Sequence, residues 1–225
     1  MISSQVNVAV YYESLCPDSR KFFTKQLYPS LQTSLSNFVN LTLVPYGKTT
    51  AKFDINSYQF ECHHGPGECQ GNKIQACALK LIHDDQNSKD YNKVAVGFIN
   101  CLMDKAMREG DNATFPTMDC AQLNHVHNIK DIENCAGHSD ASNYLAYYGG
   151  LTDKIQKPLK SVPTIVFNNQ LKDEDSKMAQ TSFVKVLCQY IEHDKPEECL
   201  KNGALSLKIS LGFVLLMASF SRHFL

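Results

Sequence analysis

Hydrophobic and polar positions alternate near the start of the chain, where residues 6–12 read VNVAVYY. This period of two, in β-branched and aromatic residues, predicts a strand. From Pro17 the apolar positions follow helical spacing to about Asn37, and residues 38–47 predict a second strand. A strand, a helix and a strand in this order predict a β-α-β unit with parallel strands.

The middle of the chain has a different pattern. From about residue 57 to residue 150 the apolar positions recur at helical spacing, cysteines lie among them, and no strand is predicted. The last helix of this segment is expected to begin at Ser139 or Asp140 and to end at Gly149-Gly150, because glycine is common just after a helix. The segment is therefore predicted to be a helical insertion.

The last third returns to a strand pattern. Residues 161–170 read SVPTIVFNNQ, in which Asn168-Asn169 suits a hairpin turn between two strands, and an amphipathic helix follows at about residues 183–191. The sequence thus predicts one α/β domain over residues 6–200, in which a β-α-β half and a β-β-α half flank the helical insertion at about 57–150.

Charge and hydropathy limit the partners. Lys plus Arg (22) and Asp plus Glu (23) nearly cancel, and no basic stripe with interleaved aromatic residues occurs, so we expect no nucleic-acid partner. We also expect a monomer. The apolar run at residues 209–220 is shorter than the ~20 residues that span a bilayer. We expect the tail at 201–225 to be removed or disordered, with membrane contact only if it signals a lipid anchor.

Cysteine content indicates the compartment. The chain has nine cysteines, and Asn40 and Asn112 each begin an Asn-x-Thr glycosylation tripeptide. Both features favour the secretory pathway, with a lysosomal or extracellular destination. The first ten residues lack the apolar stretch of a signal peptide. We therefore expect that a signal peptide has been removed from the chain or that its start was assigned wrongly.

One cysteine lies where a reactive thiol is expected. In YYESLCPDSRKF, residues 11–22, Cys16 falls between the predicted strand and helix. The unpaired N–H groups of a helix N-terminus favour a thiolate there, and a buried structural cysteine is the alternative. We favour the reactive thiol, because the polar Glu13, Asp18 and Ser19 predict exposed surroundings.

Pro163 supplies a possible second half of such a site. It follows Val162 and heads the predicted strand in SVPTIVF. A thioredoxin-like site has a cis-proline at this place facing the nucleophile, and the residue before it offers backbone groups to an extended peptide substrate. Proline alone is a weak signal, since only about 5–6% of X-Pro bonds are cis. We predict that Cys16 and Pro163 are neighbours, with Val162 and Pro163 contacting the substrate.

The densest motif is CHHGPGECQGNKIQAC at residues 62–77. Its cysteines and histidines are candidate zinc ligands, but their spacing does not match paired short knuckles, so we expect disulfides and no metal. The motif resembles the signature C-Q-H-G-x-x-E-C-x-x-N-x-x-x-x-C of the gamma-interferon-inducible lysosomal thiol reductase family. The matching residues are Cys62, His64, Gly65, Glu68, Cys69, Asn72 and Cys77, whereas His63 replaces glutamine.

The resemblance extends over residues 6–200. It implies a thioredoxin-like fold with an α-helical insertion, secretory or lysosomal residence, and thiol-disulfide oxidoreductase activity on protein disulfides. The family site is usually Cys-x-x-Cys, and this chain has Ser19 in place of the second cysteine.

Ser19 sets the expected mechanism. We predict that the catalytic residues are Cys16 as nucleophile, Ser19, which at most donates a hydrogen bond to the thiolate, and Pro163. An external small thiol, with no other cofactor, is expected to resolve the mixed disulfide, and the lack of an internal resolving thiol is expected to lower the activity. The alternative is a catalytically weak binding module for unfolded chains that contain cysteine. The sequence leaves both open.

The cysteine count agrees with one free thiol. Nine is odd, and without Cys16 eight cysteines remain for four disulfides, in any of 105 pairings. We expect Cys188 and Cys199 to form a local pair. The eight are Cys62, Cys69, Cys77, Cys101, Cys120, Cys135, Cys188 and Cys199.

Overall fold

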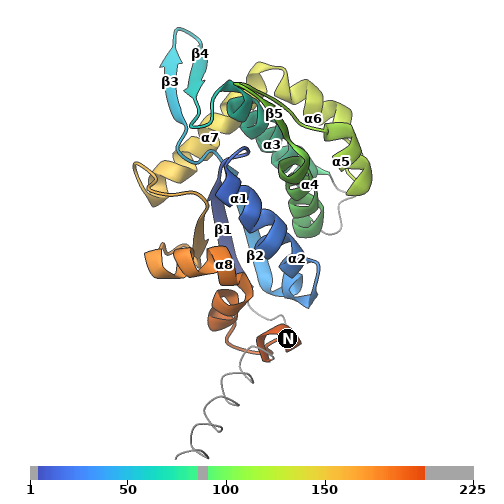
Figure 1. Ribbon diagram of the computed structural model, residues 1–225, viewed down its shortest axis with the longest axis vertical. Helices are drawn as coiled ribbons and strands as arrows, with labels where there is room; N and C mark the ends of the chain where they lie inside the picture. Colours follow the sequence, from blue (N-terminus) through green and yellow to red (C-terminus); the bar gives the residue numbers. More distant parts are fainter. Residues whose placement is uncertain (1–4, 86–90, 201–225) are drawn as a thin grey trace, which may run out of the picture.

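The computed structural model of the chain describes residues 5–85 and 91–200 (Figure 1). Its central sheet has three strands in the order β2-β1-β7. Strand β1 (Val6–Tyr12) pairs in parallel with β2 (Val39–Pro45) and antiparallel with β7 (Thr164–Phe167). The predicted parallel β-α-β unit is therefore confirmed.

The helical connection between β1 and β2 is less regular than the sequence predicts. The α-helix α1 (Pro17–Phe22), the π-helical η1 (Phe23–Leu27) and α2 (Tyr28–Leu31) follow one another directly. The expected end near Asn37 instead falls in a 3₁₀ helix, η2 (Ser34–Phe38).

Five helices dominate the middle of the chain. They are α3 (Pro66–Asp84), α4 (Tyr91–Lys105), α5 (Thr117–Leu123), α6 (Ile129–Ala136) and α7 (Ser139–Ile155). Figure 1 shows α3 to α6 gathered on one side of the molecule. The predicted end of α7 at Gly149-Gly150 is wrong, because the helix continues to Ile155. A Cβ at Gly149 would lie 2.7 Å from the Tyr46 ring, so this glycine permits close packing inside the helix.

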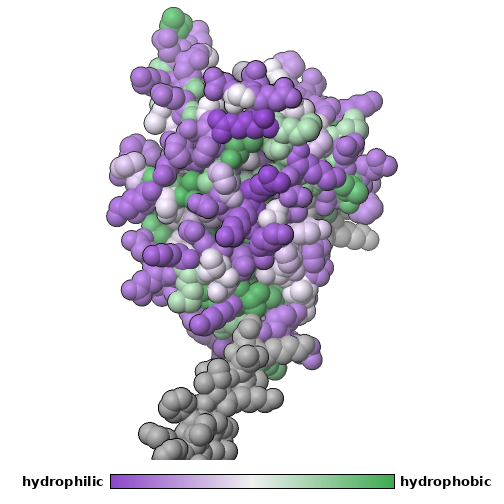
Figure 2. All heavy atoms as spheres, viewed as in Figure 1, coloured by the Kyte–Doolittle hydropathy of each residue, from purple (hydrophilic) through white to green (hydrophobic). Residues whose placement is uncertain are grey.

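The expectation of no strand between residues 57 and 150 is also wrong. Two antiparallel hairpins occur there or at its edge: β3 (Thr50–Asp54) with β4 (Ser57–Glu61), and β5 (Met107–Glu109) with β6 (Asn112–Thr114). Their side chains are mostly exposed, so the alternation of buried and exposed positions that reveals a strand is missing. Figure 2 shows apolar atoms at the tip of the β3–β4 hairpin, on a face that is otherwise largely hydrophilic.

The turn after β7 forms, but the strand predicted to follow it does not. Asn168 and Asn169 both have positive φ, 48° and 59°, as a hairpin turn requires. Beyond them only Gln170 makes an isolated bridge to Phe167, and α8 (Asp173–Tyr190) begins three residues later. Three acidic residues in the first turn of α8 favour the helix over a longer strand.

Both faces of the sheet are covered. Val8 and Val10 of β1 belong to the main core with residues of α1, α3, α4 and α8, whereas Tyr11 packs on the opposite face with Val44 and Val166, near α7. Within the described residues no helix is long and apolar enough to cross a bilayer. The predicted tail at 201–225 lies outside the described residues.

Candidate active site

Cys16 is the N-cap of α1, directly after the loop that leaves β1. Pro17 occupies the first helical position, where its missing N–H costs nothing. The Ser19 backbone N–H donates to the Cys16 Sγ at 3.5 Å. Cys16 is the free cysteine of the described residues. The helix N-terminus therefore directs a hydrogen bond and its partial positive charge at this sulfur.

The surroundings of Cys16 are less exposed than the sequence predicts. Pro17 and Asp18 are exposed, but Cys16 is only 5% exposed and both Glu13 and Ser19 are fully buried. The expectation of exposed polar surroundings therefore holds for Asp18 and is wrong for Glu13 and Ser19, which neighbouring segments cover.

The loop before β7 lies against this sulfur. Sγ of Cys16 is 3.9 Å from the backbone oxygen of Val162, and the Val162–Pro163 peptide bond is cis. The register of the sheet explains the meeting, because Thr164 at the start of β7 pairs with Tyr11 near the end of β1. The structure thus brings together Cys16 and Pro163.

Ser19 lies one helical turn beyond Cys16, at the position of the missing second cysteine. Its side chain is fully buried, and within the described chain its Oγ has no hydrogen-bond partner. A hydroxyl without a partner gains nothing from burial, whereas a thiol at this place would tolerate it better.

The 62–77 motif holds the loop that carries Cys16. Asn72 Oδ1 accepts a hydrogen bond from the Ser14 backbone N–H at 2.9 Å, and the Glu68 backbone oxygen accepts one from the Ser14 hydroxyl at 3.1 Å. A Cβ at Gly71 would lie 2.5 Å from Ser14 Oγ, so glycine allows α3 this close approach. Gly65, with φ of 87°, is the N-cap of α3. The motif therefore acts as a support for the loop from Glu13 to Cys16.

Two buried carboxylates and two imidazoles form a cluster beside that loop. Glu13 Oε2 lies 3.3 Å from Nδ1 of both His63 and His64, and Glu68 Oε2 lies 2.7 Å from Nδ1 of His64. Burial raises the pKa of Glu68, the nearby Glu13 raises it further, and hydrogen bonds from His64 oppose the shift. Glu13 Oε1 accepts from the Lys48 backbone N–H at 2.8 Å. Sequence reasoning missed this cluster and the part of Ser14, because long-range folding assembles them.

The other eight cysteines form four disulfides. The pairs are Cys62–Cys69, Cys77–Cys135, Cys101–Cys120 and the expected local pair Cys188–Cys199. Because Cys62 and Cys69 are joined to each other in a disulfide, neither of these sulfurs can bind zinc. Asn40 and Asn112, the candidate glycosylation sites, are exposed.

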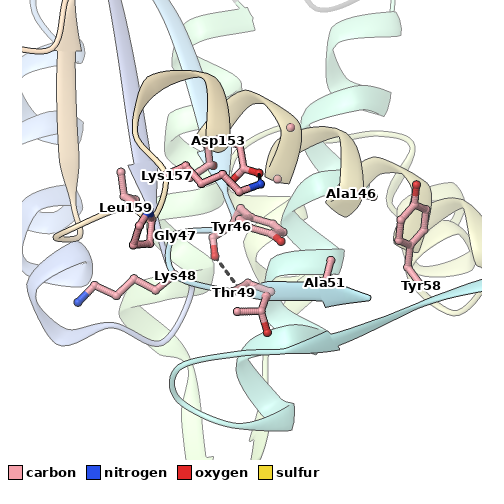
Figure 3. A pocket seen from close by; sticks show the side chains of 15 residues that line it. Tyr46, Gly47, Lys48, Thr49, Ala51, Tyr58, Ala146, Asp153, Lys157 and Leu159 are labelled. Atoms are coloured by element: carbon pink, nitrogen blue, oxygen red, sulfur yellow. Dashed lines mark hydrogen bonds and ion pairs between the residues drawn. The ribbon is translucent and has the colours of Figure 1, made fainter. Parts of the chain in front are cut away.

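A cavity of about 490 Å³ opens between the segment after β2 and α7 (Figure 3). Tyr46 and Lys48 line it together with Asp153, Lys157 and Leu159. Lys157 pairs with Asp153, and Thr49 donates a hydrogen bond to the Tyr46 backbone oxygen at 2.6 Å. Leu159 belongs to the loop between α7 and β7 that also carries Val162.

Comparison with known proteins agrees with this arrangement. The family model described as gamma interferon inducible lysosomal thiol reductase matches residues 7–124, which include Cys16 and the complete 62–77 motif. The chain belongs to this family. GILT-like protein 1 of Drosophila melanogaster is 40% identical over 205 residues, which cover 90% of this chain and 82% of that protein.

Two further family relatives have similar coverage. The gamma-interferon-inducible lysosomal thiol reductase-like protein of Anopheles gambiae is 38% identical over 214 residues, or 94% of this chain and 87% of that protein. The gamma-interferon-inducible lysosomal thiol reductase of Mus musculus is 28% identical over 200 residues, or 88% and 73%. The similarity thus extends well beyond the motif.

Solved structures confirm the fold class. Chlamydia trachomatis DsbA and oxidised BdbD from Bacillus subtilis each superpose with a TM-score of 0.54 at 14% identity. The matches cover 80% and 83% of this chain, and 87% and 97% of those chains. The predicted thioredoxin-like α/β fold with a helical insertion is confirmed. Together with the family, it identifies this member of the gamma interferon inducible lysosomal thiol reductase family as a thiol oxidoreductase.

Proposed function

We propose that this chain reduces or exchanges disulfides of protein substrates, with Cys16 as its single nucleophile and an external small thiol as the reductant. The observation that carries the proposal is the position of the Cys16 sulfur. It is a free thiol at a helix N-terminus, it accepts the Ser19 N–H at 3.5 Å, and it lies 3.9 Å from the Val162 oxygen.

The first step is attack of the Cys16 thiolate on a substrate disulfide. A bond forms between Cys16 Sγ and one substrate sulfur, the substrate S–S bond breaks, and the second substrate sulfur leaves as a thiolate that takes up a proton. The helix N-terminus and the Ser19 N–H stabilise the attacking thiolate. The backbone of Val162 and Pro163 is suited to align an extended substrate chain beside the sulfur.

The second step needs a thiol from outside, because Ser19 offers no sulfur. One small thiol attacks the mixed disulfide and releases the reduced substrate, and a second frees Cys16 from the small thiol. The sum converts one substrate disulfide and two small thiols into two substrate thiols and one small-molecule disulfide. If a substrate cysteine attacks instead, the result is disulfide isomerisation without net reduction.

The setting that we propose is the secretory pathway, with a lysosomal or extracellular destination. Four disulfides and the exposed Asn40 and Asn112 suit an oxidising compartment with glycosylation. The relatives from Carassius auratus and Mus musculus carry the word lysosomal in their names.

The test is turnover of a disulfide-bonded protein over a series of small-thiol concentrations. For the natural chain we expect the turnover rate to rise with the concentration of small thiol. For Cys16→Ser we expect only the uncatalysed rate, because an alcohol is a far weaker nucleophile without a base. Circular dichroism of both proteins verifies that the variant folds.

Two results would contradict the proposal. Equal turnover by Cys16→Ser would remove Cys16 from the mechanism. Covalent capture of substrate by the natural chain, without Cys16-dependent turnover at any thiol concentration, would establish the binding module instead.

A further inference from the structure

Three side chains next to the Cys16 loop place metal-ligand atoms close together. Oε2 of Glu13 and imidazole nitrogens of His63 and His64 all lie within 4.8 Å of one another. Glu13 Oε2 is 3.3 Å from Nδ1 of each histidine. Two imidazoles and one carboxylate are a ligand set that proteins use for zinc.

The distances suit one shared ion. Zinc binds imidazole nitrogen and carboxylate oxygen at about 2.0–2.2 Å, so two ligand atoms of a tetrahedral site lie about 3.3–3.5 Å apart. The two nitrogen–oxygen distances at Glu13 have this value. An ion shared with Glu13 therefore suits both of these distances, and the two imidazole nitrogens, which lie within 4.8 Å of each other, must adjust to the same spacing.

The charge of the cluster favours a cation. Glu13 and Glu68 are fully buried, and the charged partners that the structure gives them are the imidazoles of His63 and His64. A buried carboxylate is costly unless a positive charge compensates it. Glu68 is not one of the three grouped ligands, so it contributes negative charge beside the ion.

The ligands are held in place, and one side of the cluster is open. The Lys48 N–H fixes the other oxygen of Glu13 at 2.8 Å. Glu68 Oε1 accepts the His64 backbone N–H at 3.0 Å, and the Cys62–Cys69 disulfide closes the loop that carries both histidines. The His63 side chain is 51% exposed, so an ion can enter and a water can complete its coordination.

We propose that Glu13, His63 and His64 bind one divalent transition-metal ion of the zinc type, with water as the fourth ligand. Both histidines then present the lone pair of Nδ1 and carry their proton on Nε2. His64 thereby gives up the hydrogen bond from Nδ1 to Glu68 Oε2, 2.7 Å long without the ion, and the Glu68 carboxylate turns away from this nitrogen. The ion connects Glu13, which lies three residues before the nucleophile Cys16, to the loop that carries His63 and His64. The site is independent of the thiol chemistry, since it uses no sulfur.

The experiment is calorimetric titration of zinc chloride into Cys16→Ser at neutral pH, a background in which the thiol cannot bind zinc. We expect one ion per chain and a higher melting temperature with zinc. His63→Gln, which introduces the residue of the family signature, and His64→Gln should each weaken zinc binding at least about tenfold.

His83→Ala is the matched control, because His83 is an exposed histidine beside Asp84 at 3.4 Å, away from the cluster. It should bind zinc like the parent protein. The proposal is overturned if the parent binds no zinc, or if His63→Gln and His64→Gln bind it as tightly as His83→Ala does. The titration measures zinc binding and not turnover, so a chain that binds no zinc would leave the proposed thiol mechanism unaffected.

Discussion

At the scale of single residues, Ser19 is the reason why the proposed mechanism needs an external thiol to release the mixed disulfide. Its side chain is fully buried in the first turn of α1, three residues after the N-cap Cys16, and residues three apart at a helix lie on the same face. A cysteine at this position would therefore lie next to the nucleophile. The hydroxyl that replaces it can neither attack a mixed disulfide nor find a hydrogen-bond partner in the described structure.

We predict that Ser19→Cys lets the chain resolve its own mixed disulfide. Turnover should become much less dependent on small-thiol concentration, whereas the initial attack by Cys16 should change little. Rapid-mixing measurement of mixed-disulfide formation and decay separates the two steps. Ser19→Ala is the control, because it removes the hydroxyl without adding sulfur and should keep the dependence on thiol. An unchanged decay rate in Ser19→Cys would contradict the prediction.

A second residue prediction concerns Gly47, which contacts the buried Glu13. Its φ is 59°, and a Cβ there would lie 2.3 Å from Glu13 Cγ. Gly110 has nearly the same φ, 60°, but a Cβ added there would meet nothing within 4 Å, which makes it a matched control. We expect Gly110→Ala to lower the free energy of unfolding by about 1 kcal/mol through the backbone alone. Gly47→Ala should cost about 2 kcal/mol more, because Glu13 must also move. Urea denaturation measures the free energy of unfolding of both variants. Equal losses would contradict the prediction, because they would show that the Glu13 side chain moves aside at no energetic cost.

At the scale of elements, the site depends on α3 as much as on α1. Helix α3 carries Glu68, Gly71 and Asn72 to the loop between β1 and α1, where they contact Ser14. The motif thus acts at a distance in sequence from the cysteine that it supports. The contact with Ser14 explains why Asn72 is polar and yet buried.

We predict that Asn72→Ala destabilises the protein and loosens the Cys16 loop. The change leaves the buried Ser14 N–H without its acceptor at 2.9 Å, which costs about 1–3 kcal/mol. Chemical denaturation measures the loss, and the rate at which Cys16 reacts with a small disulfide reagent reports the loop. Gln70→Ala, an exposed position on the same helix, should change neither quantity. A variant at position 72 that matches Gln70→Ala in both measurements would refute the support role.

At the scale of the whole molecule, local patterns and long-range contacts were not equally predictable. The parallel strands and the thiol at the helix N-terminus follow from residues that are close in sequence, and so does the turn at Asn168-Asn169. The exposed hairpins escaped prediction because no buried alternation marks them. The contacts of Ser14 with α3 and the cluster around Glu13 join segments about 50 residues apart, which periodicity cannot reveal.

The alkaline limit of the fold follows from its buried tyrosines. Burial raises the pKa of Tyr46 to about 12, with Asp153 adding to the shift, and burial raises the pKa of Tyr91 to about 12. Tyr12 and Tyr148 are shifted in the same direction, also mainly by burial. In the unfolded chain a phenol ionises near pH 10. Because the folded state holds these phenols neutral, their contribution to stability is complete below pH 10 and is lost as the pH rises from about 10 to about 12.

We therefore predict that part of the ten tyrosines ionises only as the protein unfolds. A titration that follows phenolate absorbance and circular dichroism together should give one group of tyrosines near pH 10 with the fold intact, and a second group at higher pH that coincides with unfolding. Tyr46→Phe should remove one phenol from the second group and leave the first unchanged. If all tyrosines ionised near pH 10 while the circular dichroism stayed native, the packing of Tyr46 against Gly149 and of its neighbours in the core would be looser than the structure describes.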